Sequence, residues 1–374
     1  MNLIEGVAVS NHCDYSFGDQ SGCIGNVAGA YMKQADPCNT EFADLVKGGK
    51  PFMTVFIDNI RLYNRPLKAD TESDQKWIDG LMETNDLLKT CGNYPDTKFC
   101  IFTNLEDTPI TEDIHDKIPE NVVAIYGTNA VGFGGKVHPF PYGVQRIIHP
   151  SDNRIGILKK YLQQEKVKPK KLLYINHSEH TNISERGNVR KKFSGRKYVT
   201  IGERVHYDLY CQQILDHKFM ICPQGNGVDC HRNWEVLYLG RVPIMKKSKY
   251  LQELYKDYPI LWVNDFMDCT KSLLSSNNHL FEKAQNIDNN LLDLYSVFNR
   301  AVKNAKSLTV SKKYTSTPCS QRCSTIDDPI PEAPPETKAL LFLRSKYSVF
   351  IFGNSINNYL NLPLMALRLL RLVL

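Results

Sequence analysis

The sequence predicts an α/β fold made of two doubly wound parallel sheets. Short apolar runs alternate with helical patterns through the first part of the chain, and the same alternation restarts near residue 172. Strands that alternate with helices are typical of parallel sheets. Residues 159–197, between the two series, hold twelve Lys or Arg against three Glu and include a linker-like stretch at Glu165–Lys171. We therefore expect two facing Rossmann-like domains with a ligand cleft between them.

The first series of apolar runs predicts five strands and one helix. The helix is expected at Asp74–Lys89, where Trp77, Leu81 and Leu88 stand at helical spacing. The strands are expected at Gly6–Ser10, Phe52–Ile57, Phe99–Thr103, Val122–Tyr126 and Val137–Pro141.

The second series predicts four more strands and, outside the segment discussed below, two helices. The helices are expected at Tyr207–Leu215 and Asn289–Val302. The strands are expected at Leu172–Asn176, Lys218–Cys222, Val242–Met245 and Ile260–Val263.

A third part of the chain begins at residue 306, where the composition changes. Ser307–Thr337 is rich in Ser, Thr and Pro and is typical of a flexible spacer. Tyr347–Leu367 contains no charge, but Gly353, Pro363 and several Asn make it poor material for a membrane span. The tail is either an amphipathic segment that gives peripheral membrane contact or a packed or unstructured piece. The expected divisions are 1–155, 156–305 and 306–374.

Composition excludes several classes of protein. Of the 374 residues, 42% are hydrophobic and 23% are charged, as in ordinary globular proteins. The net charge of +6 suits an anionic small ligand and is too small to favour nucleic acid. Eleven scattered cysteines without CxxC pairs favour free thiols over a zinc site or a disulfide framework. The first residues lack the features of a secretory signal, so we expect a cytoplasmic protein.

One segment, residues 219–245, carries most of the functional information. An apolar run ends at Cys222, a turn with Gly225 and Gly227 follows, and a helical pattern then leads to a second strand. Glycines in such a turn let the backbone approach a ligand, and N–H groups at a helix start favour anionic oxygens. The segment therefore predicts a site for a phosphate-bearing ligand. Three polar residues stand where the helix begins: Asp229, His231 and Arg232.

This segment resembles the donor-domain motif of exostosin-type glycosyltransferases and, more closely, of related bacterial and large-virus sugar transferases. Those proteins share a Pro-x-Gly-x-Gly-x-Asp-x-His-Arg-x-Trp-Glu run, followed by a small-residue turn and a Pro-Ile strand. The flanking stretches 172–186 and 255–265 also resemble that domain, and His12–Gly22 resembles an opening loop of the N-terminal domain. The good match covers residues 170–270. Eleven positions of the motif match: Pro223, Gly225, Gly227, Asp229, His231, Arg232, Trp234, Glu235, Gly240, Pro243 and Ile244.

The resemblance implies the GT-B fold, two Rossmann-like domains with the nucleotide-sugar in the second. It implies a hexosyl- or pentosyltransferase that moves a sugar from a nucleoside diphosphate to a hydroxyl of a glycan acceptor, with inversion favoured. Cationic side chains and helix starts would stabilise the departing diphosphate. We therefore expect no metal and no cofactor beyond the nucleotide-sugar donor. UDP is the favoured carrier and GDP the alternative, while the acceptor, the linkage and the oligomeric state are left open.

The matched residues suggest individual roles in donor binding. Arg232 is expected to bind the diphosphate, since its guanidinium fork suits phosphate oxygens; an ion pair with Asp229 is the alternative. Glu235 would accept hydrogen bonds from the ribose, or be a carboxylate favoured by the helix dipole. Arg186 would supply a second cation, for which the nearby Arg190, Lys191 and Lys192 are alternatives. Trp234 is expected in the core. The glycine turn presents N–H groups to the diphosphate or is only a tight turn. The expected donor-binding set is Gly225, Asn226, Gly227, Asp229, His231, Arg232, Glu235 and Arg186.

An inverting transfer also requires a base that takes the proton of the acceptor hydroxyl. It is expected in the first domain, facing the donor across the cleft. Asp14 is the first choice, Asp19 the second and Asp58 the third, and His12 belongs to the same loop as Asp14. This loop follows the first expected strand, where α/β sheets present functional groups. Each aspartate is equally explained as a turn former or a helix cap.

Two other classes of protein remain as alternatives. A non-catalytic subunit that binds a glycan or a nucleotide-sugar would keep the donor domain and lack the base; the intact run from Asp229 to Glu235 disfavours it. A nucleotide-binding epimerase would need a glycine motif near the N-terminus and a Tyr-x-x-x-Lys pair. Neither is found in the required context.

Overall fold

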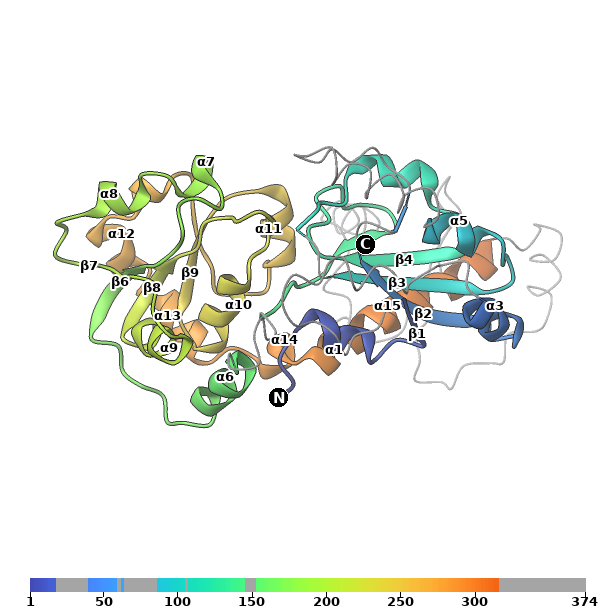
Figure 1. The fold of residues 1–374 in the computed structure, drawn as a ribbon, viewed down its shortest axis with the longest axis horizontal. Helices are drawn as coiled ribbons and strands as arrows, with labels where there is room; N and C mark the ends of the chain where they lie inside the picture. The colour runs from blue at the N-terminus through green and yellow to red at the C-terminus, as the bar shows by residue number, and fades with distance from the viewer. Residues whose placement is uncertain (18–39, 59–61, 64–85, 105–106, 145–152, 316–374) are drawn as a thin grey trace, which may run out of the picture. The chain divides into compact units, whose positions relative to one another are not determined.

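The computed structural model describes residues 1–17, 40–58, 62–63, 86–104, 107–144 and 153–315 (Figure 1). Residues 1–312 form one compact unit that contains two five-stranded parallel sheets. The chain is thus an α/β protein with a two-Rossmann-like layout, as the sequence predicts. Most of the helix predicted at Asp74–Lys89 and all of the tail 316–374 lie outside the described residues.

The first sheet has the strand order β1-β2-β3-β4-β5, which follows the order of the chain. All its neighbouring strands are parallel. Four of the predicted strands are confirmed as β2 to β5, with ends that shift by one or two residues. The strands are β1 (Tyr15–Ser16), β2 (Phe52–Asp58), β3 (Lys98–Asn104), β4 (Val122–Gly127) and β5 (Val137–Pro139).

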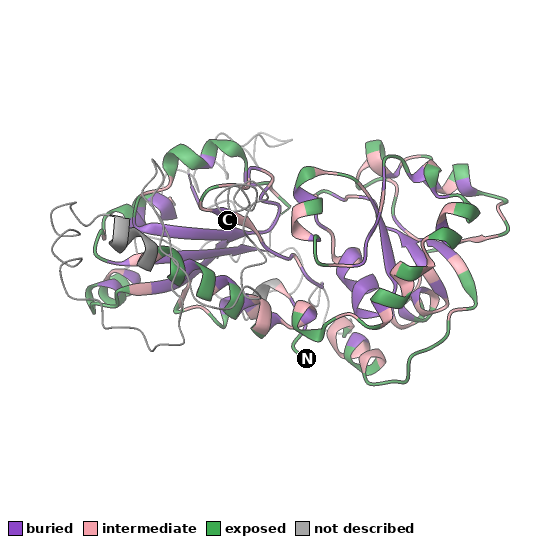
Figure 2. Ribbon diagram, turned by 180° about the vertical axis from the view of Figure 1, so that it is seen from behind, coloured by how far each residue is buried: buried purple, intermediate pink, exposed green. Residues whose placement is uncertain are grey.

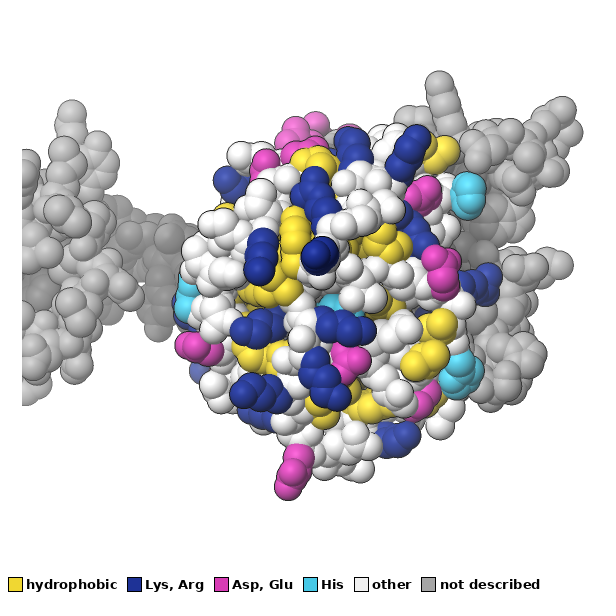
Figure 3. Space-filling view, turned by 90° about the vertical axis from the view of Figure 1, so that its left-hand side faces the viewer, with side chains coloured by type: hydrophobic (Ala, Val, Ile, Leu, Met, Phe, Trp, Pro, Cys, Tyr) yellow, Lys and Arg dark blue, Asp and Glu magenta, His cyan; other side chains and the backbone are white. Residues whose placement is uncertain are grey.

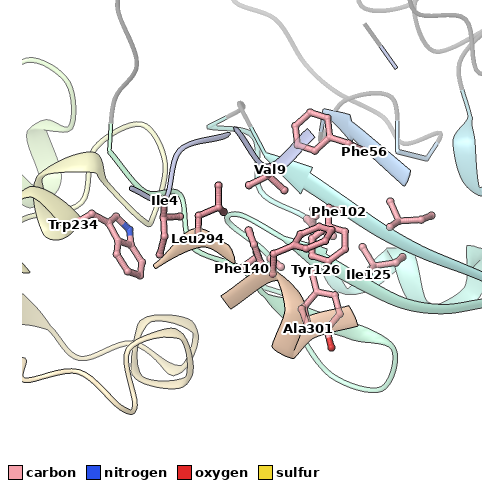
Figure 4. Packing of buried hydrophobic residues seen from close by; sticks show 14 of the residues in the cluster. Ile4, Val9, Phe56, Phe102, Ile125, Tyr126, Phe140, Trp234, Leu294 and Ala301 are labelled. Carbon is pink, nitrogen blue, oxygen red and sulfur yellow. The ribbon is translucent and has the colours of Figure 1, made fainter. Parts of the chain in front are cut away.

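Both faces of the first sheet are covered, which explains why β2, β3 and β4 are almost continuously apolar and buried (Figure 2). On one face, Phe42 of α3 (Thr40–Lys47) lies against Phe99, with ring centroids 6.1 Å apart. On the other face, Phe102 stacks on Phe298 of α15 (Leu294–Thr315), with centroids 4.5 Å apart. Figure 4 shows this second core, where Phe102 lies beside Phe140. Within the described residues this part of the chain also contains α1 (Gly6–Ser10), α5 (Leu87–Gly92) and η1 (Glu112–Lys117).

The prediction of a strand at Gly6–Ser10 is wrong, because this segment forms helix α1. A five-residue apolar run is too short to distinguish a strand from a buried helix. Val9 is fully buried, and α1 packs on β2 and β3, so the apolar residues are covered as the pattern required. The place beside β2 is taken instead by β1, which begins at Tyr15.

The second sheet has the strand order β10-β9-β8-β6-β7, and all neighbours are parallel. From β6 the chain moves outward to β7, then returns to the other side of β6 and continues outward through β8, β9 and β10. Ligands of doubly wound sheets bind at the carboxyl ends of the strands where this reversal occurs. The reversal lies between β6 and β8. The strands are β6 (Lys171–Ile175), β7 (Val199–Ile201), β8 (His217–Ile221), β9 (Val242–Lys246) and β10 (Leu261–Val263).

The four strands predicted for the second series are confirmed, and the three-residue β7 is an addition. The helix predicted at Tyr207–Leu215 is α9, and it has the predicted ends. The other described helices of this part are α6 (Arg154–Leu162), α7 (Ile183–Arg186), α8 (Val189–Phe193), α10 (His231–Tyr238), α11 (Lys249–Leu254), η2 (Phe266–Asp268), α12 (Lys271–Ser276), α13 (Asn278–Gln285) and α14 (Asn289–Leu292).

The single helix predicted at Asn289–Val302 is divided into α14 and α15 by Asp293. Asp293 has an extended backbone, pairs with Leu3 in a β-bridge, and accepts the N–H of Asn2 at 2.7 Å. The interruption is therefore imposed by the N-terminal segment of the chain. Because α15 continues to Thr315, the spacer predicted from Ser307 is wrong for its first nine residues. The predicted divisions after residues 155 and 305 both fall inside helices, α6 and α15.

The basic segment 159–197 is only partly a linker, because it contains β6, α7 and α8. Figure 3 shows Lys and Arg side chains dispersed among uncharged ones on the face that carries β6, β7 and α8. The seven cysteines of the described ranges are free thiols, as predicted for those positions. Among the helices that the structure describes, none is both long enough and apolar enough to cross a membrane.

The N-terminal residues tie several distant segments together. Ile4 N–H donates to the hydroxyl of Tyr238 in α10 at 2.7 Å, and Val144 N–H donates to Ile4 O at 2.8 Å. Gly143, beside Val144, has φ +76°, and a Cβ there would lie 2.1 Å from Ile4 O. Glycine at position 143 is therefore required both by its backbone angle and by the approach of the N-terminal segment.

We expect Gly143→Ala to lower the free energy of unfolding by about 3 kcal/mol or more, because the left-handed backbone cost adds to a backbone clash. Gly49→Ala is the matched control, since Gly49 has φ +83° and open space around its Cα. The control should cost only about 1–2 kcal/mol. Urea unfolding of both variants measures the difference, and equal costs would contradict the role given to the Ile4 contact.

Candidate ligand-binding site

A cavity of about 1060 Å³ lies at the carboxyl ends of β6 and β8, where the strand order of the second sheet reverses. Its walls come from the loops that follow β6, β7 and β8, from Arg154 of α6, from Tyr207 and Tyr210 of α9, and from the start of α10. Asp107 and Tyr142 also line it. They belong to residues 1–144, which contain the first sheet and are called the first-sheet part below. All eight residues predicted to bind the donor line this cavity. The structure therefore brings the predicted set together in one place.

The motif folds as the sequence predicts: strand β8, a turn, helix α10 and strand β9. Helix α10 ends in a Schellman motif, in which Gly240 has φ +65°. Gly240 N–H donates to Leu237 O, and Arg241 N–H donates to Val236 O, both at 2.9 Å. Trp234 is fully buried against Tyr255, as expected for a core residue. These local features fix where α10 begins and which side chains its first turn presents.

The two glycines of the turn are required by close side-chain approaches. A Cβ on Gly225 would lie 2.9 Å from Arg186 Nη2, and a Cβ on Gly227 would lie 2.7 Å from Asn129 Nδ2. Gly225 N–H donates to Gly227 O at 3.1 Å, so it is not available to a diphosphate in this arrangement. The turn therefore acts mainly by admitting Arg186 and Asn129, which corrects the predicted role of the Gly225 amide. Asn226, between the glycines, is exposed to the cavity.

Asp229 is a structural residue rather than a direct ligand contact. Its side chain is 1% exposed, and burial raises its pKa while the hydrogen bonds that it accepts oppose this rise. Both carboxylate oxygens are occupied by protein donors, so the predicted donor-binding role of Asp229 is replaced by a role in holding the site together. The five donors are Tyr142 N (3.0 Å), Trp234 Nε1 (2.9 Å), Cys230 N (2.8 Å), Asn233 Nδ2 (3.1 Å) and Tyr255 Oη (2.5 Å).

Arg232, unlike Asp229, is not satisfied by protein partners in the described part of the chain. Its Nε is buried and has no hydrogen-bond partner, and within the described residues the guanidinium forms no hydrogen bond or ion pair at all. The alternative of an ion pair with Asp229 is therefore not observed. A buried unpaired donor costs about 1–3 kcal/mol, and more when it is charged. Arg232 is thus a cation at the cavity wall that lacks a counter-charge in direct contact.

Arg186 lines the same cavity, but each of its three guanidinium nitrogens is hydrogen-bonded to the protein. Its Nε donates to Gln224 O at 2.7 Å, Nη1 to Ser178 O at 3.3 Å, and Nη2 to Pro223 O at 3.4 Å. These bonds join the loop after β6 to the turn after β8. Arg186 therefore carries positive charge to the cavity while it positions the glycine turn.

Glu235 lies one turn into α10 and is 4% exposed. Burial raises the pKa of its carboxyl, and the neighbouring Arg232 and Arg154 guanidinium groups oppose that rise. Tyr207 and Tyr210 of α9 also lie close to it and line the cavity. The arrangement places a buried carboxylate beside two tyrosines of the cavity wall, and this carboxylate can accept hydrogen bonds from hydroxyl groups.

His231 is held by the first-sheet part of the chain. Its ring stacks on Tyr142, with centroids 4.3 Å apart, and its Nδ1 lies 2.8 Å from Gly143 O. Burial lowers the pKa of His231 to about 4, so the ring is neutral near pH 7 and Nδ1 carries the proton that is donated to the carbonyl. The remaining Nε2 is then an acceptor. His231 therefore brings no charge to the cavity.

The residues predicted as the base are not assembled at this cavity. Asp14 accepts hydrogen bonds from Thr54 N at 2.7 Å and from Lys50 Nζ. Burial alone would raise the pKa of Asp14, but the bonds from Lys50 and Thr54 lower it. His12 packs against the rings of Tyr295 and Phe298 of α15. Neither residue lines the cavity.

The structure of the N-terminal segment explains these positions. Asp14 precedes β1 and lies opposite Thr54 near the amino end of β2, because the predicted strand before it is a helix. Asp58 ends β2 at the carboxyl edge and is 5% exposed, and it is not a lining residue. Asp19 lies outside the described residues.

Several lining residues were not singled out from the sequence. His177 follows β6, is 4% exposed, and has no hydrogen-bond partner for either ring nitrogen among the described residues; burial and Arg232 lower its pKa to about 3. Asp107 follows β3 and is exposed. Both stand just after apolar strands, which is the signal that could have identified them. Tyr142 and Arg154 carry no comparable signal in the sequence.

No family model and no curated protein matches this chain. The resemblance to exostosin-type transferases therefore stays a prediction. In the described ranges, no group of three or more His, Cys, Asp or Glu side chains could hold a metal ion.

We expect Asp229→Asn to lower the free energy of unfolding by about 1–3 kcal/mol, because an amide nitrogen would replace an acceptor that faces buried donors. Asp257→Asn is the control, since Asp257 is exposed and, like Asp229, belongs to the part of the chain that contains the second sheet. It should change stability by less than about 0.5 kcal/mol. Denaturant unfolding of both variants tests the assignment, which fails if the two substitutions cost the same.

Proposed function

We propose that the protein is a nucleotide-sugar-dependent glycosyltransferase of the GT-B type, with its donor site in the cavity described above. The observation that carries the proposal is Arg232, a guanidinium without a hydrogen bond or ion pair among the described residues, at the reversal of a doubly wound sheet. A diphosphate would supply the missing acceptors, and planar guanidinium groups bind phosphate oxygens through paired hydrogen bonds.

The charge around the cavity supports an anionic ligand. Among the residues that the structure describes, five arginines line it, and arginine stays charged at all physiological pH values. Of the carboxylates on the wall, Asp229 is saturated by protein donors and Glu203 accepts Arg190 Nη2 at 2.6 Å. The lining arginines are Arg154, Arg186, Arg190, Arg204 and Arg232.

In the proposed reaction, a sugar passes from a nucleoside diphosphate to a hydroxyl of a glycan. Arg232 would stabilise the charge that develops on the departing diphosphate, and Arg186 would add to the positive field. Glu235 would accept hydrogen bonds from the ribose beside Tyr207 and Tyr210. UDP stays the favoured carrier and GDP the alternative, and no metal is required by this scheme.

A non-catalytic subunit that binds a glycan or a nucleotide-sugar is the second candidate. It is favoured by the positions of Asp14 and His12, neither of which lines the cavity. The two candidates share donor binding and differ in turnover, so donor hydrolysis separates them.

We expect calorimetric titration to give a Kd in the range of about 1–100 μM for UDP or GDP, and little binding of CMP. Arg232→Ala should weaken binding at least about tenfold, because a hydrogen bond to a charged group contributes about 1.5–3 kcal/mol. Glu235→Gln should weaken binding of the nucleoside diphosphate but not of inorganic pyrophosphate, which has no ribose. Addition of EDTA should leave every Kd unchanged.

Lys271→Ala is the control for loss of one positive charge, since Lys271 is exposed and does not line the cavity. It should leave the affinity unchanged. If the wild-type protein binds none of the nucleotides, the proposal is contradicted. Loss of binding in EDTA would contradict the metal-independent scheme alone.

A further inference from the structure

Asp107 is the one acidic residue that the first-sheet part of the chain, as far as it is described, contributes to the cavity wall. It follows β3, at the carboxyl edge of the first sheet, and its side chain is exposed. Its Oδ1 lies 3.0 Å from the position that a Cβ on Gly227 would occupy. Asp107 therefore stands directly against the glycine turn that leads to Arg232.

The other carboxylates of the cavity are less suited to take a proton from an acceptor. Asp229 accepts five protein donors, and Glu203 is paired with Arg190. Glu235 is buried beside Arg232, where it would face the donor nucleotide. Glu179 lies in the loop after β6, and it therefore belongs to the same part of the chain as the residues proposed to contact the diphosphate.

Inversion at the anomeric carbon requires the attacking oxygen to approach from the side opposite the departing diphosphate. A base is then expected from the part of the chain that does not hold the diphosphate. Asp107 meets this condition, and within the described residues it has no hydrogen bond or ion pair that would engage its oxygens. Gly227 has no side chain that would cover its Oδ1.

We propose that Asp107 is the catalytic base of the transfer, an inference that rests on the proposed function. The acceptor oxygen attacks the anomeric carbon and forms the new glycosidic bond. The bond between that carbon and the diphosphate oxygen breaks, and its electron pair leaves with the nucleoside diphosphate. The hydroxyl proton passes to the Asp107 carboxylate. With water as acceptor, the same step hydrolyses the donor.

Donor hydrolysis tests this assignment without knowledge of the natural acceptor. A set of UDP- and GDP-linked hexoses and pentoses is screened with wild type, and the release of nucleoside diphosphate is followed for the best donor. Asp107→Asn should lower kcat at least about 100-fold, the usual contribution of a general base, while the Kd of the nucleoside diphosphate changes less than about threefold. Asp116→Asn is the matched control, because Asp116 is exposed in the same connection between β3 and β4 and does not line the cavity.

The dependence of kcat on pH gives a readout that a merely structural role would not move. Wild-type kcat should fall as the base is protonated at low pH, and Asp107→Asn should lose this limb. Turnover of Asp107→Asn within about threefold of wild type would overturn the assignment, as would a joint loss of turnover and nucleotide binding. A large loss in Glu179→Gln with an active Asp107→Asn would move the base to Glu179. If wild type binds nucleotide and hydrolyses no donor, the enzymatic part of the proposed function fails, and the assignment of Asp107 fails with it.

Discussion

The carboxylate of Asp229 is the contact on which the geometry of the cavity depends. Its donors come from the start of α10, from Tyr255 after α11, and from the backbone of Tyr142 in the first-sheet part of the chain. Asp229 N–H in turn donates to Asn129 Oδ1 at 2.9 Å. One buried residue thus fixes the first turn of α10 against segments 26 to 100 residues away. The directions of His231 and Arg232, which follow it in sequence, are consequences of that anchoring.

The two arginines at the turn differ in how far the protein satisfies their hydrogen-bond donors. Arg186 has carbonyl acceptors for three of its nitrogens, so its energy of desolvation is offset within the protein. Arg232 has none among the described residues, although its Nε is equally removed from solvent. A fold retains such a cost when a ligand offsets it, which is why a free Arg232 says more about function than a satisfied one. Two arginines that line the same cavity therefore differ: the protein provides acceptors for Arg186 and, among the described residues, none for Arg232.

Local sequence features predicted the elements, and long-range contacts decided the roles. The β8-turn-α10-β9 unit follows from an apolar run, glycines and a C-terminal cap, all within residues 217–246. The function of Asp229 depends on Tyr142, which lies 87 residues earlier and has no distinguishing pattern. The loop that was expected to carry the base lies elsewhere for a related reason: the short, mostly apolar run at Gly6–Ser10 fits a strand and a buried helix equally well. Once that segment is helical, Asp14 moves to the amino end of the sheet and pairs with Lys50.

Burial also determines which groups supply charge to the cavity. It lowers the pKa of His231 to about 4 and that of His177 to about 3, so both rings are neutral near pH 7. The positive charge at the reversal of the second sheet is then carried by arginines, which do not lose their protons. Attraction of an anion is therefore independent of the titration of these two histidines in the physiological range.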